Sequence, residues 1–325
     1  MQLIRFALPM AIALPMALAL SFFAPGAGAA DHTPRPATGD QHRSYVFAAT
    51  GDTLPYRLFV PASYRGDRDY PLLVVLHGGG STQDRPMDNT GLEETAEKRG
   101  YIVVSPLGYN RFGGWGNIYP VVVTPQTAAG STDFVAMSKA EGPGKAAAVP
   151  PPPRPPGPPL PPAAEDEYLE QPAGTLADAH IAVLSEEETL AAIADVEKAY
   201  RIDRRRIYLM GNSAGGVGTL YLAAKYPHMW AAIAPQGGVI AAWSYPYWRL
   251  RDAHISALFV HGERDEHCNP KWSRAMAERA TADGVDAQLL IVPGGTHGGA
   301  WTQVLPQIFD FFDAHVKAAT AGMKE

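Results

Sequence analysis

One serine stands in a pattern that is typical of enzyme nucleophiles. Residues 211–215 read GNSAG, which fits G-x-S-x-G, and an apolar run at 207–210 precedes them. In this pattern a strand ends in a sharp turn, the serine hydroxyl projects from the sheet edge, and a helix follows. The glycine-loop patterns that hold phosphate groups are not present here. Ser213 is therefore predicted to be a nucleophile.

A serine hydroxyl is a weak nucleophile at neutral pH, so it needs a base and an acid that orients the base. With this type of turn the chain order is serine, acid, histidine. His297, in the glycine-rich stretch VPGGTHGGAW, is the predicted base. Asp265, in HGERDEH, is the predicted acid, and Glu263 and Asp252 remain alternatives.

Backbone amides are the expected partners of the negative charge that develops during acyl transfer. The stretch LLVVLHGGGS ends an apolar run in three glycines, which let N–H groups converge on one point. We predict that Gly78, Gly79 and Ala214 form this oxyanion hole; a plain tight turn is the alternative. His261 and His267 flank the predicted acid, but no third ligand has metal-site spacing, so neither a metal nor another cofactor is expected.

These groups must be held by a sheet, and the chain offers suitable strands. Short apolar runs, typical of strands buried on both faces, occur at 72–76, 101–105, 207–211, 231–235, 256–260 and 288–292. A hairpin is expected over 44–61 with its turn at Gly51 and Asp52. Ser185 and Glu188 have the spacing of a capping box and predict a helix that starts at Ser185. Strands that alternate with helices indicate an α/β fold with a mostly parallel central sheet and helices on both faces, in a single domain.

One segment interrupts this order. Residues 150–162 read PPPPRPPGPPLPP, and proline, which lacks an amide hydrogen and fixes φ, excludes both helix and sheet. We expect polyproline II there, inside a flexible insertion at about 120–184. A surface loop is the simplest interpretation, with a docking ligand or a wall of the active site as alternatives.

The whole chain limits the class of protein. Residues 1–30 have the layout of a secretory signal peptide, which predicts a secreted protein, periplasmic or extracellular, with a mature domain at 31–325. No later apolar run is long enough for a stable membrane anchor. The net charge of −6 without a basic block argues against nucleic acid as a partner. A single cysteine, Cys268, excludes an intrachain disulfide, and its fate, like the oligomeric state, stays open.

Taken together, the stretches YPLLVVLHGGGS, YRIDRRRIYLMGNSAGGVGTLYLAAKYP, HGERD and GGTHGGAW resemble secreted α/β-hydrolase esterases. These are the group of polyhydroxybutyrate depolymerases and feruloyl or acetylxylan esterases, and the hydrolase domain of prolyl-oligopeptidase-type enzymes is similar as well. The resemblance implies the α/β-hydrolase fold and a triad of Ser213, Asp265 and His297. Relatives often have other residues at the positions of Asn212 and Ala214, which border the pocket.

Two aromatic stretches, WSYPYWRL and YNRFGGWG, are expected near the site. Their side chains could form a flat platform for a sugar ring, an aromatic acyl group or a polymer, or else pack in the core. The candidate substrate-binding residues are Asn212, Trp115, Trp243, Tyr245, Tyr247 and Trp248.

The function expected from the sequence is a serine hydrolase that cleaves a small-molecule or polymeric carboxylic ester. An amidase, peptidase or polyamide depolymerase would use the same triad. A secreted binding protein without activity is the remaining alternative.

Overall fold

The computed structural model describes residues 37–88, 90–123, 134–144, 169–171 and 176–318. They belong to one unit, Pro36–Glu325. The predicted signal peptide and the polyproline segment 150–162 lie outside the described residues.

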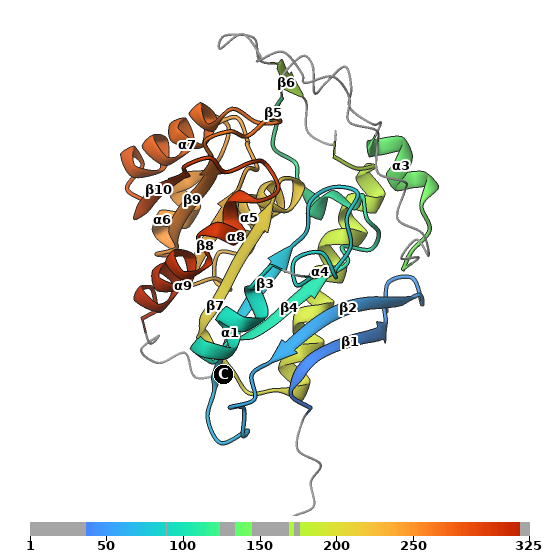
Figure 1. Ribbon diagram of the computed structural model, residues 1–325. Coiled ribbons are helices and arrows are strands. Elements are labelled where there is room, and N and C mark those ends of the chain that lie inside the picture. The colour runs from blue at the N-terminus through green and yellow to red at the C-terminus, as the bar shows by residue number, and fades with distance from the viewer. Residues whose placement is uncertain (1–36, 89, 124–133, 145–168, 172–175, 319–325) are drawn as a thin grey trace, which may run out of the picture. The chain divides into compact units, whose positions relative to one another are not determined.

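An eight-stranded sheet is the centre of this unit (Figure 1). Its strands are β1 (Gly39–Val46), β2 (Thr53–Val60), β3 (Tyr70–Leu76), β4 (Ile102–Pro106), β7 (Ile202–Asn212), β8 (Ala232–Gln236), β9 (Ser256–Gly262) and β10 (Ala287–Val292). Their order is β1-β2-β4-β3-β7-β8-β9-β10. The first two form the predicted hairpin, and β2 is antiparallel to β4. The remaining strands of this sheet, β4, β3, β7, β8, β9 and β10, run parallel to one another.

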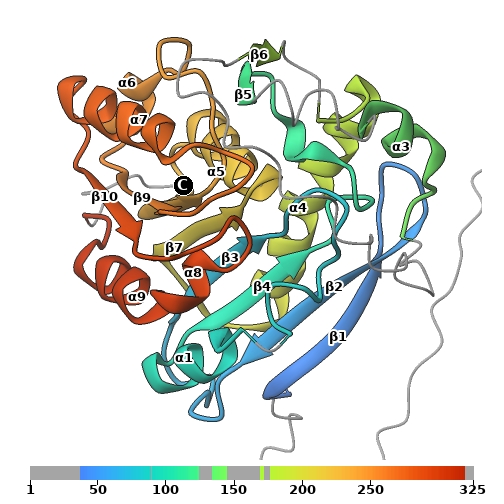
Figure 2. The ribbon, with the colours of Figure 1, turned by 45° about the horizontal axis from the view of Figure 1, so that its top comes forward.

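Helices cover both faces of the sheet (Figure 2). They are α1 (Leu92–Arg99), α4 (Ala179–Ala199), α5 (Ala214–Lys225), α6 (Tyr247–Asp252), α7 (Pro270–Ala282), α8 (Ala300–Gln303) and α9 (Leu305–Ala314), with a 3-10 turn η1 (Gly114–Gly116). Side chains of β3 alternate between the faces. Leu72 and Val74 share a core with α4 to α7, whereas Leu73 and Val75 share one with α1, α8 and α9. The α/β-hydrolase arrangement expected from the sequence is confirmed in this order of strands and layers.

The start of α4 differs from the sequence-based expectation. The helix begins at Ala179, and its cap is Asp178, whose side chain accepts a hydrogen bond from the N–H of His180. Ser185 and Glu188 lie inside the helix and are fully buried. Ser185 Oγ accepts the N–H of Trp115 at 3.1 Å, and Glu188 Oε2 accepts the N–H of Gly108 at 2.7 Å. The capping-box prediction was wrong because both side chains serve distant backbone groups instead.

The buried Glu188 makes stability depend on pH. Burial raises the pKa of its carboxyl from 4.5 to about 7, although backbone N–H groups act in the opposite direction. The folded state therefore binds a proton that the unfolded state has lost, and stability falls as pH rises from about 4.5 to 7. The free energy of unfolding of Glu188→Gln, relative to that of wild type, should therefore be roughly 2–3 kcal/mol higher at pH 8 than at pH 5. Urea unfolding of both proteins at the two pH values measures this change. The same free-energy difference between variant and wild type at pH 5 and at pH 8 would contradict the prediction.

Parts of the predicted flexible insertion have regular structure. Residues Val121–Val123 (β5) and Leu169–Gln171 (β6) pair as an antiparallel ribbon, and Phe134–Ala140 forms α3. Asn110 Nδ2 donates hydrogen bonds to the carbonyl oxygens of Ser138 and Glu141, which attaches α3 to the loop after β4. Within 120–184, these elements and the first turns of α4 are thus ordered parts of the unit.

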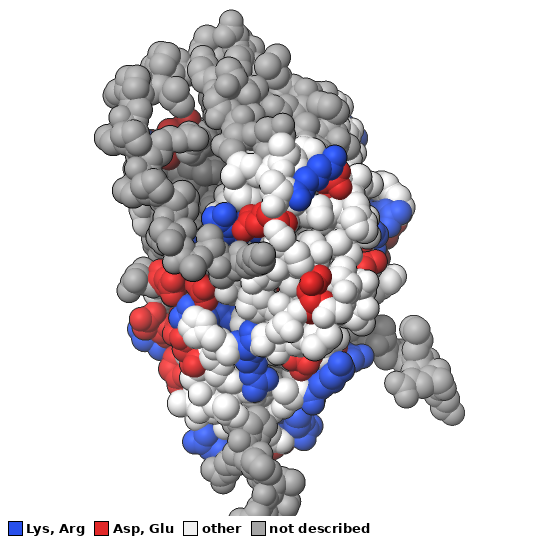
Figure 3. Space-filling model, turned by 90° about the vertical axis from the view of Figure 1, so that its right-hand side faces the viewer, with Lys and Arg blue, Asp and Glu red and all other residues white. Residues whose placement is uncertain are grey.

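The described surface carries both signs of charge. Figure 3 shows acidic and basic side chains interspersed on one face, which fits the frequent surface ion pairs such as Arg201 with Asp69. None of the helices in the described part of the chain is long and apolar enough to cross a membrane.

Candidate active site

Ser213 occupies a strained turn between β7 and α5. Its φ of 56° and ψ of −118° lie in a region that side-chain-bearing residues rarely adopt. The turn is held from both sides, since the N–H of Ser213 donates to the Gln236 carbonyl at 2.9 Å and its own carbonyl accepts the N–H of Val217 at 3.0 Å. This backbone leaves the hydroxyl at the C-terminal edge of the parallel strands, where α/β proteins bind ligands.

The two glycines around the turn are required by close packing. A Cβ on Gly215 would lie 2.2 Å from the Leu76 carbonyl oxygen of β3, and one on Gly211 would lie 2.4 Å from the carbonyl oxygen of Gly215. Backbone atoms cannot yield at such distances. The G-x-S-x-G spacing therefore reflects the contact of α5 with the ends of β3 and β7.

Asp265 and His297 lie on the loops after β9 and β10 and contact each other. His297 Nδ1 is 2.8 Å from Asp265 Oδ2, and the Asp265 side chain is fully buried. Burial alone would raise the pKa of this carboxyl, but hydrogen bonds from His261 and His297 outweigh burial and hold the pKa well below its usual range. Asp265 is thus an ionised carboxylate that fixes one nitrogen of the imidazole and leaves the other free for proton transfer.

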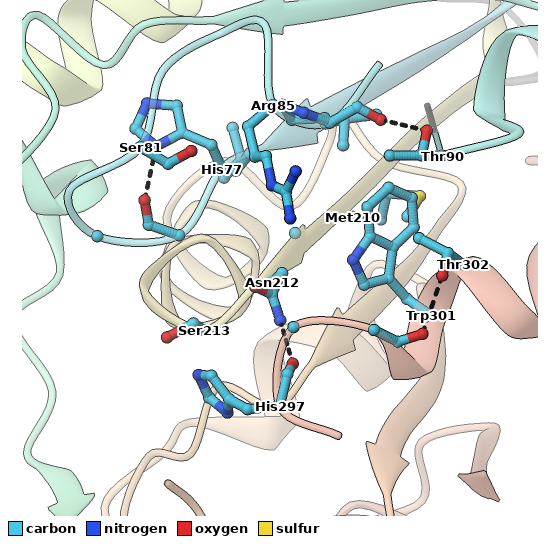
Figure 4. A pocket seen from close by; sticks show the side chains of 18 of the residues that line it. His77, Ser81, Arg85, Thr90, Met210, Asn212, Ser213, His297, Trp301 and Thr302 are labelled. Atoms are coloured by element: carbon cyan, nitrogen blue, oxygen red, sulfur yellow. Dashed lines mark hydrogen bonds between the residues drawn. The ribbon is translucent and has the colours of Figure 1, made fainter. Parts of the chain in front are cut away.

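Ser213 and His297 lie at the same end of one cavity (Figure 4). Within the described residues the structure contains no hydrogen bond between the serine Oγ and the imidazole. Catalytic hydrogen bonds of this kind often tighten only with bound substrate. The arrangement brings the three predicted residues together from three separate loops.

The glycine loop after β3 lies against the nucleophile turn. A Cβ on Gly78 would be 3.4 Å from Ser213 Cβ, and one on Gly79 would be 3.6 Å from Ala214 Cβ. The N–H groups of Gly78, Gly79 and Ala214 donate to no acceptor among the described residues. The loop that carries Gly78 and Gly79 therefore lies beside the serine turn, where an oxyanion hole is required, and its N–H groups stay the predicted donors together with that of Ala214.

Buried side chains behind the glycine loop support it. His77 Nε2 lies 2.8 Å from the Leu107 carbonyl oxygen, and Trp115 Nε1 donates to the His77 carbonyl at 3.2 Å. The N–H of Gly80 donates to the Arg111 carbonyl at 2.9 Å. The loop is thus fixed before substrate arrives, which is what electrostatic stabilisation of a transition state needs.

The cavity has a volume of about 590 Å³ and extends from Ser213 toward α8. Trp301 and Thr302 of α8 and Arg85 and Thr90 of the segment after the glycine loop line it, and Figure 4 shows the Arg85 side chain directed into it. Its size is that of ordinary ligand pockets. The sequence analysis missed these four residues; Trp301, four positions after His297 on the following helix, is the one that spacing could have revealed.

Asn212 lines the cavity, but its side-chain amide is bound to the protein. Its Nδ2 donates to the His297 carbonyl at 2.9 Å, and Gln236 Nε2 donates to the same oxygen at 3.1 Å. Asn212 also donates to Gln236 Oε1. These two amides clamp the backbone of the histidine loop, so Asn212 acts on the site by holding His297 rather than only by bordering the pocket.

The amide clamp predicts an effect on turnover. Gln236→Leu removes one of the two donors to the His297 carbonyl at similar side-chain volume, and looser placement of the imidazole should lower kcat roughly 10- to 100-fold. Gln303→Leu, which changes an exposed glutamine of α8, is the matched control and should leave kcat near wild type. Steady-state kinetics on an aryl ester compares the two. Equal kcat values for both variants would show that the clamp does not position the base.

The predicted aromatic platform is not formed. Trp115, Tyr245 and Tyr247 are buried in the core. The Trp115 side chain covers Gly218 of α5, where a Cβ would lie 2.4 Å from Trp115 Cβ, and Tyr245 donates its hydroxyl to the Leu220 carbonyl at 2.8 Å. For these three residues the alternative of core packing holds, because their side chains belong to the core that contains α5.

The other two residues of the predicted platform are at the surface. Trp243 is 61% exposed and contacts Trp272, and Trp248 is 50% exposed beside Arg249. Neither lines the cavity that contains Ser213. A role for them in binding substrate remains a prediction.

Comparison with known proteins places this chain in one family. The sequence model of the dienelactone hydrolase family matches residues 71–321. No curated protein matches the sequence.

Solved structures of similar fold include three hydrolases. A thermostable esterase is 20% identical with a TM-score of 0.55; the match covers 86% of this chain, which spans only 63% of that protein. The fluorophosphonate-binding serine hydrolase F of Staphylococcus aureus, solved with substrate bound, is 14% identical with a TM-score of 0.56 and coverages of 84% and 98%. A ferulic acid esterase of Anaeromyces mucronatus, solved with ferulic acid, is 16% identical with a TM-score of 0.51 and coverages of 89% and 93%. The likeness confirms the α/β-hydrolase fold.

Proposed function

We propose that this protein, which belongs to the dienelactone hydrolase family and is a hydrolase of the carboxylic-ester type, works through a covalent acyl-enzyme on Ser213. The observation that carries the proposal is the buried Asp265 hydrogen-bonded to His297, which lines the same cavity as a serine in a strained turn. Backbone strain of this kind clusters at active sites, which favours a catalytic role for Ser213.

The proposed reaction has two halves. Ser213 Oγ attacks the ester carbonyl while the free nitrogen of His297 takes the hydroxyl proton, and the N–H groups of Gly78, Gly79 and Ala214 bind the oxyanion. The tetrahedral intermediate collapses, the C–O bond to the alcohol breaks, and the imidazolium gives its proton to the leaving alcohol. Water then attacks the acyl-enzyme, again with His297 as base, which releases the acid and restores Ser213.

We infer an ester with a small or aromatic acyl group as the substrate. The cavity holds one unit of that size, and Trp301 offers an aromatic wall beside Thr302. The structural neighbour with ferulic acid supports an aromatic acid. Residues 1–30 predict secretion. A secreted enzyme would meet its acyl group as part of an extracellular sugar ester or polymer, which supports such a substrate.

A substrate panel tests the proposal. Purified protein is assayed with p-nitrophenyl acetate, p-nitrophenyl ferulate, a feruloylated sugar and polyhydroxybutyrate, and with the p-nitroanilides that match the two aryl esters. We expect turnover of the aryl esters well above that of the anilides. Faster cleavage of the anilides would favour an amidase, and turnover of none of these compounds would contradict the proposal.

A further inference from the structure

A second imidazole lies behind the triad acid, and the mechanism above does not use it. His261, near the end of β9, has a fully buried side chain whose Nε2 is 3.1 Å from Asp265 Oδ2. The same nitrogen is 2.9 Å from the Cys268 carbonyl oxygen, and Nδ1 is 2.6 Å from Ser273 Oγ on α7. We propose that His261 is a positioning residue that holds Asp265 in place and shares its charge, so that hydrogen bonds run from Ser273 through His261 and Asp265 to His297.

The partners of His261 determine where its proton sits. A backbone carbonyl only accepts hydrogen bonds, so the contact with the Cys268 oxygen requires a hydrogen on Nε2. Oδ2 of Asp265 lies 3.1 Å from the same nitrogen, and in the proposal this hydrogen is shared between the carbonyl and the carboxylate. In the neutral imidazole Nδ1 is then an acceptor, and the hydroxyl of Ser273 donates to it. The contact with the Cys268 carbonyl thus determines the tautomer, and the buried Ser273 supplies the donor that this tautomer needs at Nδ1.

The remaining partners of Asp265 show why His261 matters. Oδ1 accepts the N–H groups of His267 and Cys268 at 2.9 Å and 2.8 Å, and both belong to the same loop as the acid. His297 belongs to another loop. His261 is the one side-chain donor to Asp265, among the described residues, that is anchored in the sheet, where it pairs with Ile291 of β10. It therefore ties the acid loop to β9 and, through Ser273, to α7.

The consequence rests on the proposed function. A carboxylate with full burial needs its donors, because each lost hydrogen bond to a charged group is costly. Without the Nε2 donor, Asp265 would be free to turn away from His297 for part of the time, which slows proton transfer. When it does face His297 it would also carry more unshared charge and stabilise the protonated imidazole. Activity should then fall on the acid side at a higher pH than in wild type.

Two amide variants test whether the hydrogen-bond donor of His261 or only the volume of its ring matters. The terminal nitrogen of glutamine in His261→Gln reaches the position of Nε2 and can donate to Asp265, whereas that of asparagine in His261→Asn reaches only the position of Nδ1. We expect His261→Asn to lower kcat about 10- to 100-fold with little change in KM, and to move the acidic limb of kcat/KM to higher pH. His261→Gln should retain most of the wild-type kcat, and its acidic limb of kcat/KM should lie at the same pH as in wild type. The other ionisable groups that face His297, namely Glu266 and His267, are unchanged in both.

The measurement is the pH profile of kcat and kcat/KM for p-nitrophenyl acetate with wild type and both variants, with circular dichroism to establish that each is folded. The inference would be overturned if His261→Asn had the kcat of wild type and an acidic limb of kcat/KM at the same pH as wild type. Equal losses in both variants with an unmoved limb would also overturn it, because the ring would then matter only for packing. Failure of the proposed function would look different: wild type itself would not hydrolyse the ester.

Discussion

Replacing Ser213 with alanine is expected to lower kcat for aryl esters by about 10⁶-fold, the loss typical when a serine nucleophile is removed from such a triad. Without Oγ no acyl-enzyme forms, and only the oxyanion hole and substrate binding remain to favour attack by water. Steady-state and single-turnover hydrolysis of p-nitrophenyl acetate measure the effect. The fold should be preserved, because Ser213 makes its hydrogen bonds in the turn through backbone groups.

Ser244→Ala is the matched control for this substitution. Ser244 lies in the loop after β8, at the same edge of the sheet, and donates its hydroxyl to the Ala241 carbonyl at 2.9 Å. It lines no part of the catalytic cavity and should keep wild-type kcat within about threefold, as expected for a surface-loop change. Undiminished turnover in Ser213→Ala would rule out the assignment of the nucleophile.

Replacing Asp265 with asparagine is expected to lower kcat by roughly 10⁴-fold. The amide nitrogen of asparagine would donate to Nδ1 of His297, so the proton of the neutral imidazole would move to the nitrogen that must accept from Ser213. The base would then be in the wrong tautomer. A pH-dependent kcat on the same ester, compared with wild type, measures the loss.

Glu263→Gln is the matched control for the acid, since Glu263 was an alternative candidate on the same loop. Its carboxylate is exposed and accepts the N–H of Gly294 at 2.9 Å. Asp252, the other alternative, lies at the end of α6 beside Arg251. We expect Glu263→Gln to stay within a few-fold of wild type. A larger loss for Glu263→Gln than for Asp265→Asn would assign the acid to Glu263.

Much of the catalytic framework could be predicted because local constraints dictate it. The strands of a parallel sheet covered on both faces are apolar runs, and these were visible in the sequence. Gly211 and Gly215 are dictated by backbone contacts, so the turn could be recognised from spacing. The order of Ser213, Asp265 and His297 follows from the order of the strands that carry them.

Long-range partners explain what could not be predicted. Ser185 and Glu188 have capping-box spacing, yet their side-chain oxygens accept hydrogen bonds from the N–H groups of Trp115 and Gly108. These groups are some 70 to 80 positions away in the sequence. Trp115 looked like a platform residue because aromatic content does not say which way a ring points. His261 was visible only as one of two histidines near the acid. Its contact with Asp265, four positions later, depends on the turn that ends β9, and its contact with Ser273 depends on how β9 meets α7.

The cavity walls show the same limit. Arg85 and Trp301 come from segments that are separated by more than half of the chain, and no motif connects them. Their convergence depends on the packing of α8 beside the glycine loop. Substrate specificity, which these walls set, is therefore the least predictable property of the site, whereas the reacting groups are the most predictable.

The most direct test of the covalent mechanism is mass spectrometry of the protein after reaction with a fluorophosphonate probe, followed by peptide mapping. One equivalent of probe on the peptide that contains Ser213, with loss of ester hydrolysis in proportion to labelling and no labelling of Ser213→Ala, is the predicted result. Stoichiometric labelling of another residue, or full ester hydrolysis by protein that is labelled at Ser213, would contradict the account.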